Sequence, residues 1–234
     1  MTTRRIRAVL FDLDGTFADT APDLAHALNQ TLQAHQRPML SLDQIRPVVS
    51  HGGKALIQLG FGIDETHNEF ETLRQQLLDF YQQDIAQHTQ LFPGIAPLIT
   101  TLTAQQYHWG IVTNKPSWLT EPLMKVLDPD QQACCVVSGD TLTERKPHPA
   151  PLLHGCQQCE VEPEETLYIG DAERDIIAGK RAGMYTMTAL YGYIGADEQP
   201  DHWQSTAYVQ HPDDILPWLL AHNQTIDNTS HYAN

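Results

Sequence analysis

The chain is short of basic residues. Lys and Arg together number 14 among 234 residues, against 29 Asp and Glu, which gives a formal net charge of −15 with neutral His. Nucleic acids and anionic membrane surfaces are bound mainly through Lys and Arg. The composition therefore argues against both as partners. An anionic substrate must be attracted by a local site, because the surface as a whole repels it.

Long apolar runs are also missing. The run nearest the N-terminus, 8–11, stops at Asp12 and is too short for the apolar region of a signal peptide. No segment approaches the ~18 apolar residues that a transmembrane helix needs. We therefore expect a cytoplasmic protein. The hydrophobic fraction of 41% still supplies a core for one large domain or two small ones and argues against extensive disorder.

Cysteine is scarce, with four in the chain. Cys134 and Cys135 lie in an apolar stretch that is typical of a buried strand, and Cys156 and Cys159 form a single C-x-x-C. A zinc site usually needs a second such pair or a suitably spaced His pair. The segment 149–159 has the pattern of an amphipathic helix with both thiols on or near its inner face. We therefore expect Cys156 and Cys159 to be core cysteines.

Short apolar segments alternate with helical patterns along most of the chain. Strands are predicted over 6–11, 109–113, 134–137, 166–169 and 185–190. Helices are predicted over 95–106, 117–127, 149–159 and 172–182. This alternation predicts an α/β fold with a parallel sheet covered on both faces. Sheets of this kind bind ligands at the carboxyl ends of their strands.

One region breaks the alternation. Between Phe17 and Gln90 no good strand is found, and helices are predicted over 23–36, 51–59 and 65–88. A helical block after the first strand is best explained as an inserted domain that forms a lid over the carboxyl ends of the strands. The predicted division is a core of 1–17 and 91–221, a helical cap of 18–90, and a flexible polar tail of 222–234.

Polar residues follow four of the predicted strands at the ligand edge. Two carboxylates, Asp12 and Asp14, come directly after the first strand. The other strand ends carry Thr113 with Asn114, Lys146, and Asp171 with Asp175. A calcium loop starting at Asp12 is disfavoured, because an EF-hand needs Gly where Phe17 stands and needs a helix where a strand precedes.

This set of residues suits phosphoryl chemistry. Crowded carboxylates repel one another, and Mg²⁺ relieves the crowding because it prefers oxygen ligands. Asp12 can then attack a phosphate as a covalent nucleophile. The attack on a dianion faces about 8 kcal/mol of repulsion at ~4 Å and an effective dielectric of ~20. Mg²⁺ and Lys146 can offset this repulsion, Thr113 can orient the phosphate oxygens, and Asp14 can act as general acid and base.

Four motifs in this order resemble the haloacid dehalogenase superfamily of phosphohydrolases. They are Asp-x-Asp-Gly-Thr at 12–16, Thr-Asn at 113–114, Lys-Pro at 146–147 and Gly-Asp-x-x-x-Asp at 170–175. The likeness spans roughly residues 6 to 220. It implies a Rossmann-like, three-layer core with a helical cap inserted after the first motif.

The resemblance also implies a role for each motif residue. Asp12 would be the nucleophile and Asp14 the acid/base. Mg²⁺ would be held by the Asp12 carboxylate, the Asp14 backbone carbonyl and Asp171, with Asp175 behind these ligands. The phosphoryl group would be contacted by Thr113, Asn114 and Lys146.

Within the superfamily, the chain resembles the phosphoglycolate phosphatase group through the segments 9–16, 19–24 and 110–116. Finer details at 50–55, 61–62 and 191–203 resemble bacterial N-acetylmuramic acid 6-phosphate phosphatases. The expected substrate is thus a small phosphate monoester, either 2-phosphoglycolate or N-acetylmuramic acid 6-phosphate. Two readings of the cap motif His51, Gly52, Gly53 and Lys54 stay open: a substrate-specificity loop at a helix start that favours anions, or a plain helix start with flexible glycines.

Two other functions stay open. A sugar-phosphate phosphomutase would use the same scaffold and differ only in the acceptor of the phosphoryl group. A non-catalytic protein would use the acidic loops to bind a cation or a partner, although all four motifs are complete. The oligomeric state is not predicted.

Overall fold

A six-stranded parallel sheet forms the centre of the molecule, in the order β5-β4-β1-β6-β7-β8. The computed structural model describes residues 4–231, and the side chains of residues 4–228. The strands are β1 (Ala8–Phe11), β4 (His108–Val112), β5 (Val136–Val137), β6 (Thr166–Gly170), β7 (Tyr185–Ala189) and β8 (Ala207–Val209). The predicted parallel α/β sheet is therefore confirmed.

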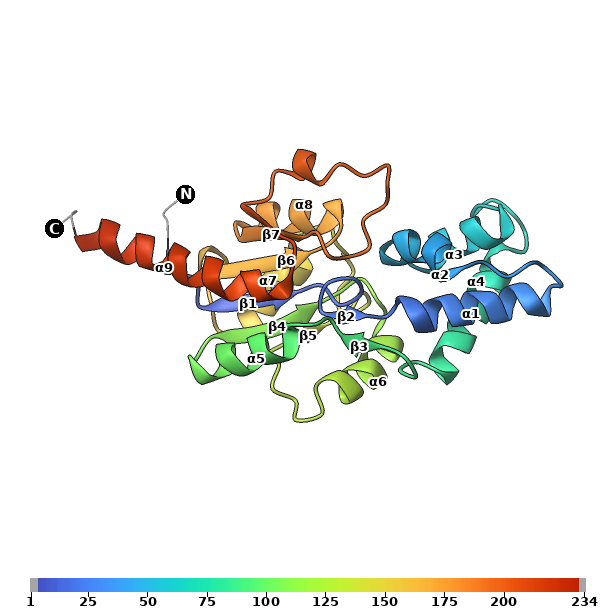
Figure 1. Cartoon of the computed structure of the whole chain (residues 1–234), viewed down its shortest axis with the longest axis horizontal. Helices are drawn as coiled ribbons and strands as arrows, with labels where there is room; N and C mark the ends of the chain where they lie inside the picture. The colour runs from blue at the N-terminus through green and yellow to red at the C-terminus, as the bar shows by residue number, and fades with distance from the viewer. Residues whose placement is uncertain (1–3, 232–234) are drawn as a thin grey trace.

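Helices cover both faces of this sheet (Figure 1). They are α5 (Ile95–Ala104), α6 (Ser117–Leu127), α7 (Ala150–Gln158), α8 (Glu173–Ala182) and α9 (Ile215–His231). Alternate residues of β1 explain the two layers of core, because successive side chains of a strand point to opposite faces. Val9 and Phe11 pack in the core with α5, α6 and α9, whereas Ala8 and Leu10 pack in the core with α7 and α8.

The inserted helices lie together beyond the carboxyl ends of the strands, at the right of Figure 1. They are α1 (Ala21–Ala34), α2 (Leu42–Ile45), α3 (Gly52–Phe61) and α4 (Phe70–Gln83), with the 3₁₀ turn Arg46–His51 between α2 and α3. The inserted helical block expected from the sequence is thus present. Its exact boundaries at 17/18 and 90/91 stay a prediction.

A small second sheet joins the two crossings between this block and the core. Strand β2 (Ala18–Asp19) pairs antiparallel with β3 (Gln90–Leu91). The expectation of no strand between Phe17 and Gln90 was wrong here. Two-residue strands are too short to show an alternating pattern, so only the pairing of distant segments reveals them.

The segment 222–231, which we predicted to belong to a flexible polar tail, is helical. Helix α9 continues to His231, and Asn223 within it is buried. The Asn223 side chain accepts a hydrogen bond from the Ile6 N–H and donates to the Ile6 carbonyl and to the Tyr107 hydroxyl. These bonds hold the helix against the residues that precede β1 and β4. The rest of that prediction, residues 232–234, lies outside the described residues.

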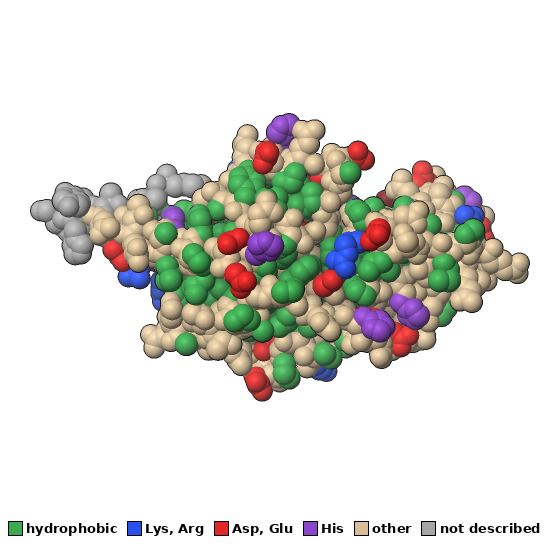
Figure 2. Space-filling model, viewed as in Figure 1, with side chains coloured by type: hydrophobic (Ala, Val, Ile, Leu, Met, Phe, Trp, Pro, Cys, Tyr) green, Lys and Arg blue, Asp and Glu red, His purple; other side chains and the backbone are tan. Residues whose placement is uncertain are grey.

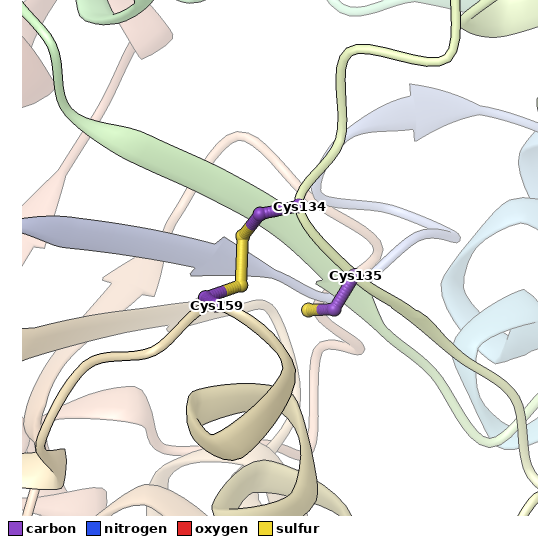
Figure 3. A group of neighbouring side chains, drawn as sticks. All are labelled: Cys134, Cys135 and Cys159. Atoms are coloured by element: carbon purple, nitrogen blue, oxygen red, sulfur yellow. A yellow bond between two sulfur atoms is a disulfide. The ribbon is translucent and has the colours of Figure 1, made fainter.

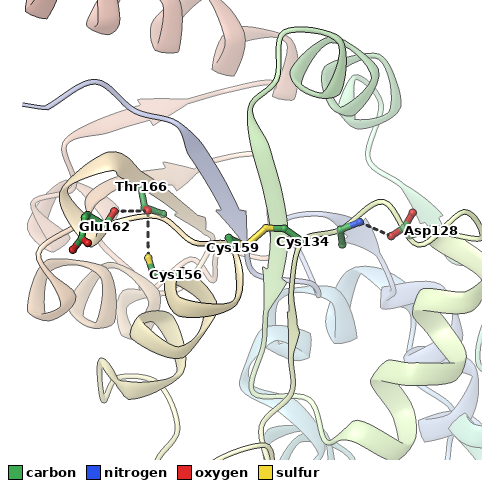
Figure 4. Close-up of a disulfide and its surroundings, with 7 residues drawn as sticks. Asp128, Cys134, Cys156, Cys159, Glu162 and Thr166 are labelled. Atoms are coloured by element: carbon green, nitrogen blue, oxygen red, sulfur yellow. Dashed lines mark hydrogen bonds between the residues drawn. A yellow bond between two sulfur atoms is a disulfide. The ribbon is translucent and has the colours of Figure 1, made fainter.

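The cysteines differ from the prediction. Cys134 and Cys159 form a disulfide with a Cα–Cα distance of 5.2 Å, whereas Cys135 and Cys156 are free and buried (Figures 3 and 4). Cys156 and Cys159 are both buried in the core, as expected, but the crosslink of Cys159 was not predicted from the sequence. Cys159 directly follows the last residue of α7, so the helical pattern no longer determines where its side chain points.

The three sulfur atoms of Cys134, Cys135 and Cys159 lie within 4.8 Å of one another. Two of them are joined to each other, and burial raises the pKa of the Cys135 thiol to about 12. Metals bind the thiolate form of cysteine. This cysteine group is therefore a crosslink beside a neutral thiol, and it is unsuited to a metal ion.

The distribution of charged side chains on the surface agrees with the excess of acidic residues in the sequence. On the face shown in Figure 2, acidic side chains are scattered over the core and the inserted helices, and basic side chains are few. Among residues 4–231, no helix is both long and apolar enough to cross a membrane.

Candidate active site

The polar residues singled out from the sequence meet at one edge of the sheet. Asp12 follows β1, Thr113 follows β4, and Asp171 follows β6, while Asp175 lies in the first turn of α8. Lys146 lies in the loop between β5 and α7. Strands β4, β1 and β6 are neighbours and parallel, so their carboxyl ends present these side chains to the same space.

Three carboxylates form what we call the acidic cluster: Asp12, Asp171 and Asp175. All three are buried, and oxygens of their carboxylates lie within 4.8 Å of one another. Burial together with the charges of Asp12 and Asp175 raises the pKa of Asp171 to about 7. Burial also raises the pKa of Asp175, against the opposing effect of Lys146. The cluster thus concentrates negative charge, which lowers the free energy of unfolding of the metal-free protein.

Lys146 is the main counter-charge of this cluster. Its buried Nζ lies 2.9 Å from Asp12 Oδ1 and 2.8 Å from Asp175 Oδ1. It also donates to the carbonyl of Val112 and to the hydroxyl of Tyr168. Burial alone would raise the pKa of Asp12, but Lys146 and then Arg174 outweigh burial and hold that pKa below its usual value. Asp12 is therefore kept ionised.

The contacts of Asp12 all fall on one of its two carboxylate oxygens. Both the Lys146 ammonium and the Leu13 N–H contact Oδ1. Among the described residues, no hydrogen bond or ion pair is formed by Oδ2. This arrangement suits a carboxylate that attacks with one oxygen while the other is fixed.

Asp171 is held from three directions. Its Oδ2 accepts hydrogen bonds from the Ser50 hydroxyl at 2.7 Å and from the Tyr193 N–H at 2.9 Å. Its Oδ1 lies 3.3 Å from the Thr16 hydroxyl. Gly15 has no side chain, and the site requires this because a Cβ there would lie 2.1 Å from Asp171 Oδ2. The glycine of the first motif thus allows the loop to approach the cluster.

Asp14 lies beside the acidic cluster and has partners of its own. Its Oδ1 accepts from the Lys115 ammonium at 2.8 Å and from the Thr20 hydroxyl. Lys115 in turn lies over the ring of Tyr81 from α4, with Nζ 4.5 Å from the ring centroid. Asp14 is therefore placed where the core meets the inserted helices.

Thr113 and Asn114 have different surroundings. Thr113 is buried, its N–H donates to the Val137 carbonyl, and its hydroxyl accepts from the Lys115 N–H. The Asn114 side chain donates to the Lys146 carbonyl at 2.9 Å and accepts from the Lys146 N–H at 3.0 Å. Both ends of the Asn114 amide are thus used to hold the backbone of Lys146.

The cap motif at 51–54 is not brought to the acidic cluster. His51 lies 3.8 Å from Glu198, and the exposed Lys54 pairs with Glu65. Gly52 and Gly53 begin helix α3. The residue just before this motif, Ser50, makes the contact with Asp171 instead.

Several site residues were missed by the sequence reasoning: Ser50, Tyr81, Lys115, Arg174 and Tyr193. Arg174 lies inside the fourth motif and donates to the Ser50 carbonyl at 2.6 Å. Lys115 directly follows the second motif. Their motif positions are a signal that could have suggested these two. Ser50 and Tyr193 lie in segments noted above for their finer resemblance, which gave them no role at the site. Tyr81 comes from a distant helix, and no local pattern distinguishes it.

The acidic cluster has the donor set that a hard divalent cation requires. Its ligand atoms are all carboxylate oxygens, and they are buried and close together. Mg²⁺ binds through one or two carboxylates with other oxygens completing its shell. Burial, and then the charges of Asp12 and Asp175, raise the pKa of Asp171, and a bound cation would favour the ionised form of this carboxylate. The residues therefore fit such an ion.

Comparison with known proteins gives consistent matches. The family model described as haloacid dehalogenase-like hydrolase matches residues 9–189. An N-acetylmuramic acid 6-phosphate phosphatase of Pseudomonas aeruginosa is 38% identical over 219 residues, which cover 94% of this chain and 97% of that protein. A phosphoglycolate phosphatase of Xanthomonas campestris pv. campestris is 40% identical over 210 residues, covering 89% and 94%.

A similar solved structure comes from Haemophilus somnus and is described as a predicted phosphoglycolate phosphatase. Its TM-score is 0.80 at 27% sequence identity, and the match covers 92% of this chain and 98% of that chain. The overall fold of this chain thus occurs in a protein that is similar to it over nearly its whole length.

Proposed function

This chain belongs to the haloacid dehalogenase-like hydrolase family, and from that membership we propose that it is a Mg²⁺-dependent phosphatase of a small phosphate monoester. The observation that carries the proposal is the contact between Lys146 and Asp12 inside a buried group of carboxylates at the ligand edge of the sheet. One lysine there fixes the attacking carboxylate and supplies positive charge for a phosphate.

In the first half of the reaction, Oδ2 of Asp12 attacks the phosphorus atom. The new P–O bond to Asp12 forms as the bond between phosphorus and the ester oxygen breaks. Asp14 gives its proton to the ester oxygen, which leaves as an alcohol. Lys146 and the Thr113 hydroxyl orient the phosphate oxygens and stabilise their charge. Asn114 holds the backbone of Lys146 in place. From the sequence we expected Asn114 to contact the phosphate, and the present proposal gives it no such contact.

In the second half, water attacks the phosphorus of the aspartyl-phosphate. Asp14, now ionised, takes a proton from that water, and the bond between phosphorus and Asp12 breaks. Inorganic phosphate is released and both aspartates return to their starting states. The Asp12 and Asp171 carboxylates with the Asp14 backbone carbonyl would hold Mg²⁺, with Asp175 and Lys146 behind them. When bound, this ion supplies positive charge that offsets repulsion between the carboxylates and the phosphate.

The proposed substrate is 2-phosphoglycolate or N-acetylmuramic acid 6-phosphate. Relatives that cover at least 84% of this chain are named for one or the other activity. The cap motif at 51–54 stays a candidate for specificity, although His51 and Lys54 pair with Glu198 and Glu65 and not with the acidic cluster.

The proposal is tested by phosphate release from both esters and from a generic aryl phosphate, with Mg²⁺ and with EDTA. Turnover should require the metal. The variant Asp12→Asn should lose turnover by more than about 10³-fold, because an amide cannot form the acyl phosphate, while its unfolding transition persists. Retention of substantial turnover in this variant would refute Asp12 as the nucleophile. Isomerised sugar phosphate in place of inorganic phosphate would indicate a phosphomutase.

A further inference from the structure

A second buried lysine lies beside the proposed general acid. The side chain of Lys115 is only 6% exposed, and its Nζ lies 2.8 Å from Asp14 Oδ1. Lys146 serves Asp12 and Asp175, whereas Asp14 is the one carboxylate that pairs with Lys115 among residues 4–228. An ammonium group has three N–H donors, and Asp14 takes one of them. Lys115 therefore keeps donor capacity that the resting site does not use.

Tyr81 provides a second unused group at the same place. It reaches from α4 in the inserted block, and the Lys115 ammonium lies over its ring. Its hydroxyl is fully buried and has no partner within hydrogen-bond distance in the described part of the chain, and the Lys115 ammonium is near enough to act on its pKa. Burial raises the pKa of Tyr81 to about 12, so the hydroxyl keeps its proton and can donate. A buried hydroxyl without a partner is costly and calls for an explanation.

The position of these two groups relates them to the leaving group. In the proposed function, on which this inference rests, Asp14 contacts the ester oxygen that leaves. Atoms bonded to that oxygen then lie next to Lys115, on the side where the core meets α4.

We propose that Lys115 and Tyr81 form a subsite for a carboxylate on the leaving group, so that the enzyme prefers carboxylated phosphate monoesters over uncharged counterparts. The ammonium and the phenol both donate hydrogen bonds, which a carboxylate accepts at two oxygens. Without Lys115, a carboxylate at this place would be repelled by Asp14 and the acidic cluster. A role for Lys115 as a counter-ion of Asp14 alone would leave the Tyr81 hydroxyl unexplained.

Two leaving groups carry a carboxylate that this subsite would bind. Glycolate and N-acetylmuramic acid, the acids in the names of the relatives, both carry a carboxylate. In the first the carboxylate is one carbon from the ester oxygen, and in the second it is across a sugar ring. Each has an uncharged counterpart: 2-hydroxyethyl phosphate for phosphoglycolate, and N-acetylglucosamine 6-phosphate for N-acetylmuramic acid 6-phosphate.

The experiment measures kcat/KM for all four esters with the wild type, Lys115→Met, Lys115→Arg, Tyr81→Phe and Lys125→Met. Within the pair that fits the site, the wild type should prefer the carboxylated ester by about 10- to 100-fold, as expected for hydrogen bonds to a charged group. Lys115→Met should abolish this ratio, Lys115→Arg should retain most of it, and Tyr81→Phe should reduce it about 3- to 10-fold. Lys125→Met removes an exposed lysine of α6 and should leave the ratio unchanged.

The ratio within a pair cancels any effect that Lys115 exerts through Asp14 alone. An equal loss for both members of the pair in Lys115→Met would make Lys115 a positioning residue and overturn the subsite. A wild type without preference in either pair would overturn it as well. The pair in which the ratio depends on Lys115 identifies the source of the carboxylate.

A binding measurement separates this inference from the proposed function. Calorimetry compares the four esters with Asp12→Asn and with Asp12→Asn combined with Lys115→Met. The carboxylated member should bind at least about 10-fold more tightly to the first protein only. Absence of turnover with every ester would contradict the proposed function, while this difference in binding would still support the carboxylate subsite. Equal binding of both members by Asp12→Asn would refute the subsite.

Discussion

At the scale of single residues, the acidic cluster shows how the fold concentrates charge for use by a ligand. The raised pKa of Asp171 reflects burial and its neighbours Asp12 and Asp175. Natural proteins tolerate such crowding at functional sites, where it is relieved when the ligand binds. The crowding of carboxylates should therefore lower the free energy of unfolding of the metal-free protein.

The stability of the metal-free protein should reveal this cost through its pH dependence. Asp171 has a pKa of about 7 in the folded state against an ordinary value of 3.8. Between these values the folded state binds the proton that the unfolded state releases, so the contribution of this group to stability falls as pH rises from about 4 to 7. The slope is at most about 1.4 kcal/mol per pH unit.

The variant Asp171→Asn removes this contribution while keeping the shape of the side chain. In EDTA, its free energy of unfolding relative to the wild type should increase from pH 5 to pH 7 and level off above about pH 8. Denaturant unfolding at a series of pH values measures the difference. A difference that stays constant over this range would contradict the raised pKa of Asp171.

The side chain of Asn114 fixes the position of Lys146. Its amide holds the Lys146 backbone with two hydrogen bonds. Asn114→Ala should therefore lower kcat about 10- to 100-fold with a smaller change in KM, because Lys146 is displaced from Asp12. Steady-state kinetics on the preferred ester gives both values.

The chain offers a matched control for this variant. Asn29 in α1 holds the Leu40 backbone with the same two-way pattern, at 2.9 Å for each bond, far along the chain from the site. Asn29→Ala should cost a similar amount of stability and leave kcat within about 2-fold of the wild type. A rise in KM for Asn114→Ala with unchanged kcat would instead favour direct contact with the phosphate.

At the scale of elements, the disulfide joins the two ends of the unit that carries Lys146. It links the segment before β5 to the residue after α7, over a sequence separation of 25 (Figure 4). The loop between β5 and α7 contains Lys146. Closing a loop of this length in the unfolded chain stabilises the folded state by about 3 kcal/mol.

Replacing both cysteines, Cys134→Ser with Cys159→Ser, should therefore lower the free energy of unfolding by about 3 kcal/mol under non-reducing conditions. Excess reductant should bring the wild type down to the value of the variant, within about 1 kcal/mol. Denaturant unfolding with and without reductant makes the comparison. Equal stability of the two proteins without reductant would show that the crosslink contributes nothing.

At the scale of the whole molecule, the net charge of −15 opposes the approach of an anionic ester. The acidic residues are spread over the surface, whereas the site cations Lys115 and Lys146 have buried side chains and Arg174 is half-buried. Attraction therefore acts at short range, after the substrate has crossed a repulsive field. Salt screens the field outside far more than the contacts within.

We expect kcat/KM for an anionic ester to rise about 2- to 5-fold as monovalent salt increases from 10 to 150 mM at saturating Mg²⁺. Enzymes that attract their substrates over a distance show the opposite trend. Initial rates at low ester concentration measure this effect. A fall of kcat/KM with salt would show that local positive potential extends beyond the site and dominates the approach.

The sequence by itself determined the parallel sheet, the inserted helices and the motif residues. Alternating strands and helices leave few topologies open, and the carboxyl ends of neighbouring parallel strands necessarily share an edge. Asp12, Thr113, Lys146 and Asp171 could be gathered at one place for that reason. The family followed from the order and spacing of the same residues.

Only the tertiary structure decided which residues from distant segments complete the site. Ser50 and Tyr81 come from the inserted helices, and Tyr193 comes from the loop after β7. The pairing of Cys134 with Cys159, the β2–β3 sheet and the anchoring of α9 by Asn223 arise in the same way. Local patterns report on neighbours along a helix or strand, whereas these contacts depend on how whole elements pack, and that information is absent from any single stretch of sequence.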